Sequence, residues 1–206
     1  LKVRDLAVVG DSDRTGTVVR FKADASIFTT TEYDYDIVAK RLRETAYLMG
    51  SSGVAIYLED ERTGKTEEFN FPEGLVAFVS HVNKNKEGLH ADVAHFVRDI
   101  PSTETDDVYR VELAMQYTDA YQESVFTFVN NINTHGGGTH LAGLKAGLTR
   151  ALNGYIKQEK LIKESEKSPS GDDLREGLSA VLSVFVPDPQ FEGQTKDKLG
   201  NREVQG

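Results

Sequence analysis

Apolar residues recur every three or four positions in three stretches of the chain, which is the spacing of one face of an α-helix. The first stretch follows polar, capping-type residues, and its apolar positions are Tyr35, Val38, Leu42, Ala46 and Met49. The second stretch is short, and its apolar positions are Leu75, Phe78, Val79 and Val82. The third follows three glycines, and its apolar positions are Leu141, Leu144, Leu148, Leu152 and Tyr155. We therefore predict three amphipathic helices.

Strands are predicted where apolar residues alternate with polar ones or form short continuous runs. The predicted strands cover residues 18–21, 54–58, 67–71, 108–117, 125–129 and 178–186. The second and third flank a polar turn, which indicates a hairpin, and the last is apolar enough to be buried on both faces. The order of strands and helices predicts an α/β sandwich with helices packed on one face of a mixed sheet.

The Gly50-Ser51-Ser52-Gly53 segment interrupts the first helical pattern. Glycine and serine in this number end helices, so we place the boundary between a first segment and a self-contained second domain here. The chain opens with Leu1 and not with methionine, and it has no apolar signal segment, so we expect it to be an internal piece of a longer protein. Its longest apolar runs fall well short of the roughly 20 residues that span a bilayer, so no membrane helix is predicted.

Charge and cysteine content narrow the possible chemistry. The 206 residues carry 24 Lys and Arg against 33 Asp and Glu, a net charge of −9, which argues against a protein that coats nucleic acid. Local basic faces remain possible. The absence of cysteine excludes disulfides, thiol nucleophiles and cysteine-bound metals, and it fits a reducing cytoplasm.

Three consecutive glycines, Gly136 to Gly138, precede the long helix and raise the question of phosphate binding. Backbone N–H groups at a helix start can hold a phosphate. A phosphate-binding loop of the Walker type would continue with lysine and then serine or threonine, whereas Thr139 and His140 follow here. A tight connection into the helix is therefore the favoured interpretation.

The histidines and paired carboxylates give no strong sign of a catalytic or metal site. His135 and His140 are five residues apart, not the four that place two imidazoles side by side on a helix, so surface or capping histidines are favoured. Asp172 and Asp173 stand where a short helix up to about Glu176 is predicted, and carboxylates there complement the helix dipole.

A polar loop after the last predicted strand contains Gln194, Thr195 and Lys196. It follows a stiff proline-containing segment, which can hold a loop in one position. A lysine ammonium is a compact charge that can pair with a terminal phosphate. From the residues alone, an ordinary solvated lysine remains an open alternative.

Six short blocks of residues occur in an order and at spacings that match a known family. The blocks are residues 13–21, 39–44, 128–132, 137–141, 175–178 and 194–199. Together they resemble the ATPase region of the DNA gyrase B family, and the B subunit of topoisomerase IV is a close relative of that family. The match extends from one end of the chain to the other.

The resemblance implies an α/β (α+β) fold in two parts. Residues 1–50 would form the C-terminal part of an ATP-binding domain of the gyrase, Hsp90, histidine-kinase and MutL type. Residues 54–206 would form a transducer domain similar to the second domain of ribosomal protein S5. Gln194 and Lys196 would contact the terminal phosphate of ATP, while Thr17 and Val19 would line the adenine pocket that also binds aminocoumarins.

The resemblance also implies partners and limits. ATP with Mg²⁺ would be the cofactor, but the Mg²⁺ ligands and the general base would lie outside this chain, so the chain alone would not hydrolyse ATP. Partners would be the gyrase A subunit in a heterotetramer, a second B subunit on ATP binding, and double-stranded DNA in the cytoplasm, with no membrane. Lys145 and Arg150, and more weakly Lys157, would face the DNA.

The role implied for the chain is to couple ATP binding and hydrolysis to DNA strand passage and negative supercoiling. Three alternatives remain open: the B subunit of topoisomerase IV, a MutL-type mismatch-repair ATPase, and a binding module without nucleotide contact. The block at residues 194–199 argues against the MutL alternative.

Overall fold

The computed structural model describes residues 5, 7–13, 15–18, 23–102, 105–163 and 165–206. The chain divides into two compact units, residues 1–34 and 35–206. The described residues of the first unit form turns without a helix or strand. Of the strand predicted at residues 18–21, all but Val18 lies outside the described residues.

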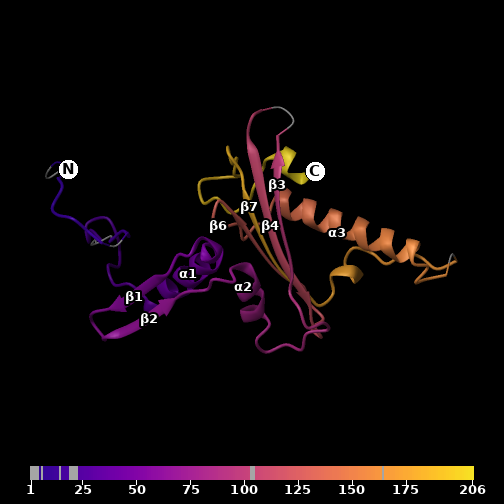
Figure 1. Cartoon of the computed structure of the whole chain (residues 1–206), viewed down its shortest axis with the longest axis horizontal. Coiled ribbons are helices and arrows are strands. Elements are labelled where there is room, and N and C mark those ends of the chain that lie inside the picture. Colours follow the sequence, from indigo (N-terminus) through magenta and orange to yellow (C-terminus); the bar gives the residue numbers. More distant parts are fainter. Residues whose placement is uncertain (1–4, 6, 14, 19–22, 103–104, 164) are drawn as a thin grey trace. The chain divides into compact units, whose positions relative to one another are not determined.

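The second unit holds all the described helices and strands (Figure 1). The elements are α1 (Tyr35–Leu48), β1 (Ile56–Asp60), β2 (Lys65–Phe69), α2 (Leu75–Val82), β3 (Ala94–Pro101), β4 (Val108–Tyr117), β5 (Ser124–Val129), β6 (Ile132–Asn133), α3 (Thr139–Gln158) and β7 (Leu178–Phe185). Single 3₁₀ turns cover Gly50–Ser52, Asp173–Arg175 and Arg202–Gln205. The three predicted helices and the hairpin are thereby confirmed.

A five-stranded sheet of order β3-β4-β7-β5-β6 forms the centre of this unit. β7 lies in the middle, antiparallel to β4 and parallel to β5, and seven of its eight residues are buried. This confirms the prediction that its apolar run is buried on both faces. Parallel strands need a crossover connection, and α3 lies in the crossover from β5 to β7.

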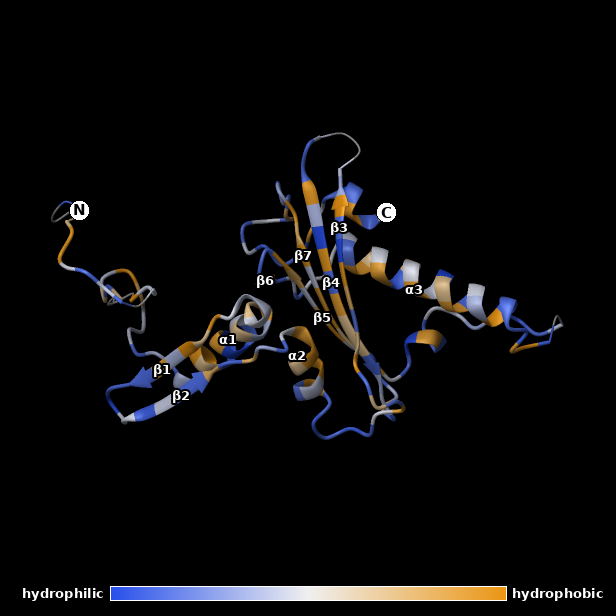
Figure 2. Cartoon of the chain, viewed as in Figure 1, coloured by the Kyte–Doolittle hydropathy of each residue, from blue (hydrophilic) through white to orange (hydrophobic). Residues whose placement is uncertain are grey.

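One face of the sheet is covered by α2. Phe78 and Val79 of this helix pack in one core cluster with Ala114, Phe128 and Val181 from three neighbouring strands. Figure 2 shows α2 as largely hydrophobic, as expected for a helix that faces a core.

The opposite face is covered by the start of α3, where Leu144 packs against Val129, Leu182 and Val184. The prediction that helices lie on one face of the sheet is therefore wrong. The alternating apolar residues of β4 are only partly buried, whereas Ala114 and Gln116 on the other side of the strand are buried. The Gln116 side chain is satisfied there by bonds to Asn83 and to a backbone carbonyl.

The segment from α1 to β2 forms a layer of its own. Ala39 and Ala46 of α1 pack against Phe69 of β2, and Tyr47 stacks on Phe78 of α2 with ring centroids 4.8 Å apart. α1 ends at Leu48, as the Gly50–Gly53 break predicts. The domain boundary placed in that break stays a prediction.

Three parts of the sequence differ from the prediction, and one of them is the two-residue strand β6, where no strand is predicted. β3 was not predicted, because it pairs only with β4 at the edge of the sheet and most of its side chains are exposed, so no apolar face is required. The short helix predicted to start in residues 170–173 and to reach about Glu176 is a single 3₁₀ turn that begins at Asp173. The Asp173 carboxylate accepts bonds from the backbone N–H and hydroxyl of Ser170 at 2.8 and 2.7 Å.

Candidate functional site

The loop that carries Gln194 and Lys196 is closed at its base. Phe191 and Leu199 form an antiparallel β-bridge, and the Gly200 N–H donates to the Gln190 carbonyl at 2.7 Å. Between these points residues 192–198 are exposed. The loop therefore presents its polar side chains to solvent from a fixed base.

Asn201 closes the same base from inside. It is 4% exposed, its Oδ1 accepts a hydrogen bond from the Gln190 N–H at 2.6 Å, and its Nδ2 donates to the Asp188 carbonyl at 3.0 Å. One buried amide thus joins the segments before and after the loop. Buried side-chain bonds of this kind are costly to break, because the freed backbone groups cannot reach water.

The glycine loop at the start of α3 is bonded to the end of this loop. The N–H of Gly136 donates to Asp197 at 2.9 Å, the N–H of Thr139 donates to Leu199 at 3.1 Å, and the Leu199 N–H donates to Gly137 at 3.1 Å. The N–H groups of Gly136 and Thr139 are therefore already bonded, as is that of Gly137, which donates to Thr134, and this supports the tight connection over phosphate binding.

Lys196 has a left-handed backbone, with φ of 59°. Non-glycine residues adopt this region at a cost, and they remain there when their surroundings fix them, often at functional sites. Its ammonium lies 6.0 Å from the centroid of the Phe191 ring and makes no ion pair within the described part of the chain. By contrast, Lys198 pairs with Glu192 at 3.1 Å.

His140 lies behind the glycine loop and is 3% exposed. The hydroxyl of Thr134 lies 3.0 Å from its Nε2, and burial lowers the pKa of the imidazole to about 4, so the ring is neutral at pH 7. The expectation of a surface or capping histidine is therefore wrong for His140. Its place four residues before Leu144, on the face turned to the sheet, is the sequence signal that indicates burial.

Lys145, predicted to face DNA, is ion-paired to Glu123 at the entry to β5. The other oxygen of Glu123 accepts a bond from Arg175 Nε at 2.9 Å, and Arg175 also pairs with Asp172 at 2.6 Å. Two cations and two carboxylates therefore neutralise one another. Sequence reasoning missed Glu123, since nothing in the local pattern shows that β5, α3 and the 3₁₀ turn meet there.

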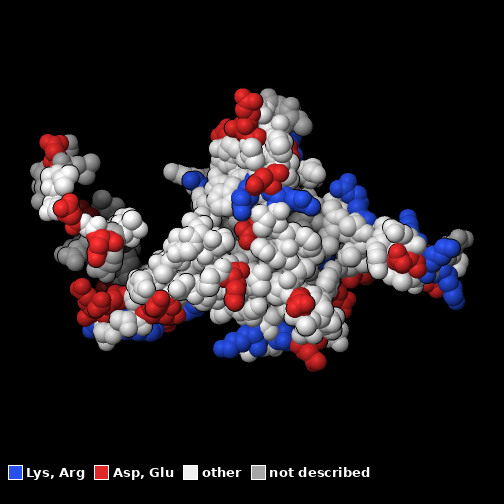
Figure 3. Space-filling model, viewed as in Figure 1, with Lys and Arg blue, Asp and Glu red and all other residues white. Residues whose placement is uncertain are grey.

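The C-terminal end of α3 is different, because its cations are exposed. α3 starts beside the sheet and runs away from it (Figure 1), and Lys and Arg gather toward its far end (Figure 3). Lys157, Lys160 and Lys163 line a hollow of about 850 Å³ there, together with the carboxylate of Glu166 and other residues that include Leu161 and Ile162.

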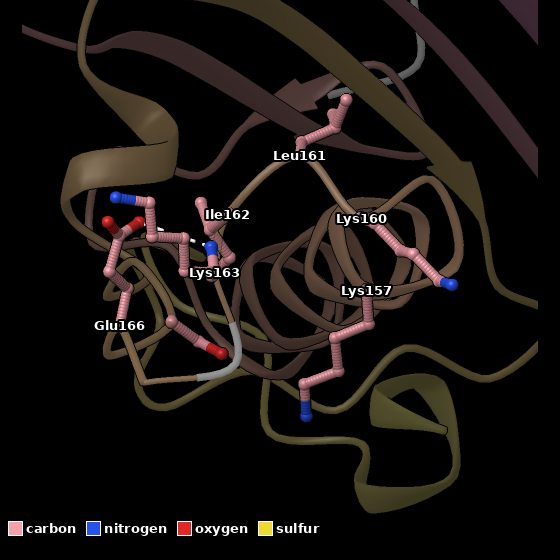
Figure 4. A pocket seen from close by; sticks show the side chains of 7 residues that line it. Lys157, Lys160, Leu161, Ile162, Lys163 and Glu166 are labelled. Carbon is pink, nitrogen blue, oxygen red and sulfur yellow. Dashed lines mark hydrogen bonds between the residues drawn. The ribbon is translucent and has the colours of Figure 1, made fainter.

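The three ammonium groups around this hollow point away from one another (Figure 4). A single small anion cannot be held by three such groups at once. An extended polyanion can contact them one after another. Arg150, also predicted to face DNA, is exposed on the same helix.

The remaining predicted site residues lie in the first unit. Thr17 is exposed, and Val19 lies outside the described residues. Their place in an adenine pocket stays a prediction. Within the described ranges, no group of three His, Asp or Glu residues is placed to hold a metal ion. In the same ranges, no helix has both the length and the apolarity needed to cross a membrane.

Comparison with known proteins identifies the family. The profile of DNA gyrase B matches residues 74–206. The DNA gyrase B subunit of Clostridium acetobutylicum is 51% identical over 198 residues, which is 96% of this chain and 30% of the relative. The chain therefore spans about a third of the curated relatives that it matches.

Solved structures agree with this. The 43K ATPase domain of Thermus thermophilus gyrase B, in complex with an aminocoumarin, matches with a TM-score of 0.72 and 37% identity over 88% of this chain and 47% of that one. The topoisomerase IV ATP-binding domain of Francisella tularensis matches with a TM-score of 0.68 and 25% identity over 88% and 46%. Fold and relatives together define a segment similar to the ATPase domain of gyrase B. The chain belongs to the DNA gyrase B family.

Proposed function

We propose that this chain is the nucleotide-sensing and coupling part of a gyrase B protein, with Lys196 and Gln194 contacting the terminal phosphate of ATP. The observation that carries the proposal is the exposed Lys196 at the tip of a loop whose base is bonded to the start of α3. An ammonium on such a loop is a point charge suited to a terminal phosphate. The carboxamide of Gln194 adds a neutral donor.

The coupling follows from how the loop is attached. Residues 197–199 are hydrogen bonded to residues 136–139, where α3 begins. Attraction of Lys196 to the terminal phosphate, or the loss of that contact after hydrolysis, would therefore act on α3 and on the sheet that α3 covers. In the complete protein this movement would couple ATP binding and hydrolysis to DNA strand passage and negative supercoiling.

ATP with Mg²⁺ is the proposed cofactor, and only its terminal phosphate would be held from this chain. The ammonium of Lys196 fits that group, because it is exposed and has no ion-pair partner among the described residues. The Mg²⁺ ligands would come from residues outside the chain. Bound Mg²⁺ would neutralise phosphate charge.

DNA contact is proposed for the exposed cations of α3 and the segment after it: Arg150, Lys157, Lys160 and Lys163. The A subunit of gyrase and a second copy of the B subunit are the proposed protein partners, in the cytoplasm. The sequence relatives are gyrase B subunits and do not favour the alternative, the B subunit of topoisomerase IV, although the Francisella tularensis domain has a similar fold. Supercoiling and decatenation assays of the assembled enzyme separate the two.

Substituting Lys196 in a protein that also holds the ATP-binding domain tests the sensing role. We expect Lys196→Ala to leave nucleotide binding measurable and to lower kcat for ATP roughly a hundredfold or more, since one charge-stabilising donor is lost. Lys198→Ala is the matched control, because Lys198 lies in the same loop but pairs with Glu192. Unchanged hydrolysis in Lys196→Ala would instead identify a binding module without nucleotide contact.

A further inference from the structure

Glu123 holds the cation that the family resemblance assigns to DNA. Its two carboxylate oxygens are divided between Lys145 on α3 and Arg175 on the 3₁₀ turn. Arg175 has a second carboxylate partner in Asp172, whereas Lys145 has Glu123 as its one ion-pair partner in the described part of the chain.

The two cations differ in how accessible they are. The Arg175 side chain is 11% exposed, and the Lys145 side chain is 33% exposed. A phosphate arriving from solvent can reach the ammonium of Lys145. The guanidinium of Arg175 stays with its two carboxylates, so Glu123 would remain partly neutralised if Lys145 left it.

We propose that Glu123 is a counter-anion that competes with DNA phosphate for Lys145 and so limits how tightly this face binds DNA. The inference rests on the proposed DNA contact of α3 and adds to it the residue that weakens the contact. In the paired state the four charges of the cluster sum to zero and offer a phosphate no net attraction. When a phosphate takes the place of Glu123 on Lys145, one phosphate contact is gained and one ion pair is lost.

This competition has a purpose in an enzyme that must let a duplex pass. Each phosphate contact makes binding tighter and more dependent on salt. A lysine that exchanges between a fixed carboxylate and a moving phosphate contributes less affinity than a free lysine. DNA is therefore bound less tightly at this face than it would be by a free lysine.

The test compares two variants that remove the same charge from the same cluster. Glu123→Gln frees Lys145 but keeps an oxygen that can accept from Arg175. Asp172→Asn also removes one negative charge, but from a 95% exposed carboxylate that pairs with Arg175 and not with Lys145. Binding of the 206-residue chain to a fluorescent DNA duplex is measured by anisotropy over a series of salt concentrations.

We expect Glu123→Gln to bind the duplex several-fold more tightly at low salt, with a log–log salt slope steeper by about 0.9. Asp172→Asn should lie close to the parent chain. In the double variant Glu123→Gln with Lys145→Ala, the gain should disappear, as it must if it comes from Lys145. Because this double variant has the net charge of the parent, it is Asp172→Asn that separates the gain from a change in net charge.

Three results distinguish the counter-anion role of Glu123 from the DNA contact on which it rests. If Glu123→Gln and Asp172→Asn tighten binding equally, the effect is general charge and Glu123 has no special role. If Lys157→Glu with Lys160→Glu weakens binding while Glu123→Gln changes nothing, DNA contact stands and the competition is refuted. If no variant changes binding, both are refuted. Circular dichroism and thermal melting check that each variant is folded.

Discussion

At the scale of single residues, His140 makes stability depend on pH. Its imidazole is buried and neutral, with a pKa of about 4 against an ordinary value of 6.5, and its Nδ1 has no hydrogen-bond partner among the described residues. The unfolded chain binds a proton at this histidine below pH 6.5, while the folded chain does so only near pH 4. Stability from His140 is therefore complete above pH 6.5 and is lost as the pH falls toward 4.

The prediction is a loss of about 2 kcal/mol from this one residue between about pH 7 and pH 5. Urea unfolding at both pH values gives the free energy of unfolding. A His140→Gln variant is the reference, since glutamine does not titrate, and other titrating groups act equally in both proteins. Equal losses in the two proteins would show that the ring is protonated in the folded state.

At the scale of elements, the residue before α3, Gly138, lies against the backbone of Leu199, and no space is left there for a side chain. Its φ is 132°, and a Cβ built there would lie 2.3 Å from the Leu199 carbonyl oxygen. We expect Gly138→Ala to destabilise the chain by about 2 kcal/mol or more, because backbone atoms must move apart.

Gly147 provides the matched comparison on the same helix. It lies inside α3, and a Cβ there meets nothing within 4 Å. Gly147→Ala should therefore raise stability by about 0.5–1 kcal/mol. Opposite signs in urea unfolding would attribute the cost at Gly138 to its contact with Leu199 and not to alanine itself; a cost at both positions would contradict this.

The elements also show what could be predicted from sequence. Most residues from Leu178 to Phe185 are apolar, with Ser179 and Ser183 between them, and this run predicts β7 as a buried strand. β3 carries Arg98 and Asp99 among its apolar residues, and an edge strand with open faces imposes no simple pattern, so it was missed.

For the site, too, local sequence patterns do not contain the contacts between distant residues. Lys196 was assigned by resemblance, since a single exposed lysine has no local signal. The β-bridge between Gly138 and Leu199 joins residues 61 positions apart in the sequence. The ion pair between Glu123 and Lys145 joins residues 22 positions apart. Such contacts depend on how the elements pack, which local patterns do not contain.

At the scale of the whole molecule, a net charge of −9 coexists with a cluster of cations at the far end of α3. The overall charge repels a polyanion at long range, where salt screens it, while Lys157, Lys160 and Lys163 act at short range. This combination favours weak DNA binding that is sensitive to salt, as the proposed passage of a duplex would require.

Two double variants that change the net charge equally but at different places on the chain test this arrangement. Lys157→Glu with Lys160→Glu should abolish measurable duplex binding by the chain, because two phosphate contacts become repulsive. Lys40→Glu with Lys84→Glu changes the net charge by the same amount, but at exposed lysines on α1 and after α2. Duplex binding by this second double variant should fall only slightly. Anisotropy titrations at several salt concentrations give both results. An equal loss in the two double variants would mean that net charge governs the interaction, and then the position of the cations along α3 would be irrelevant to DNA.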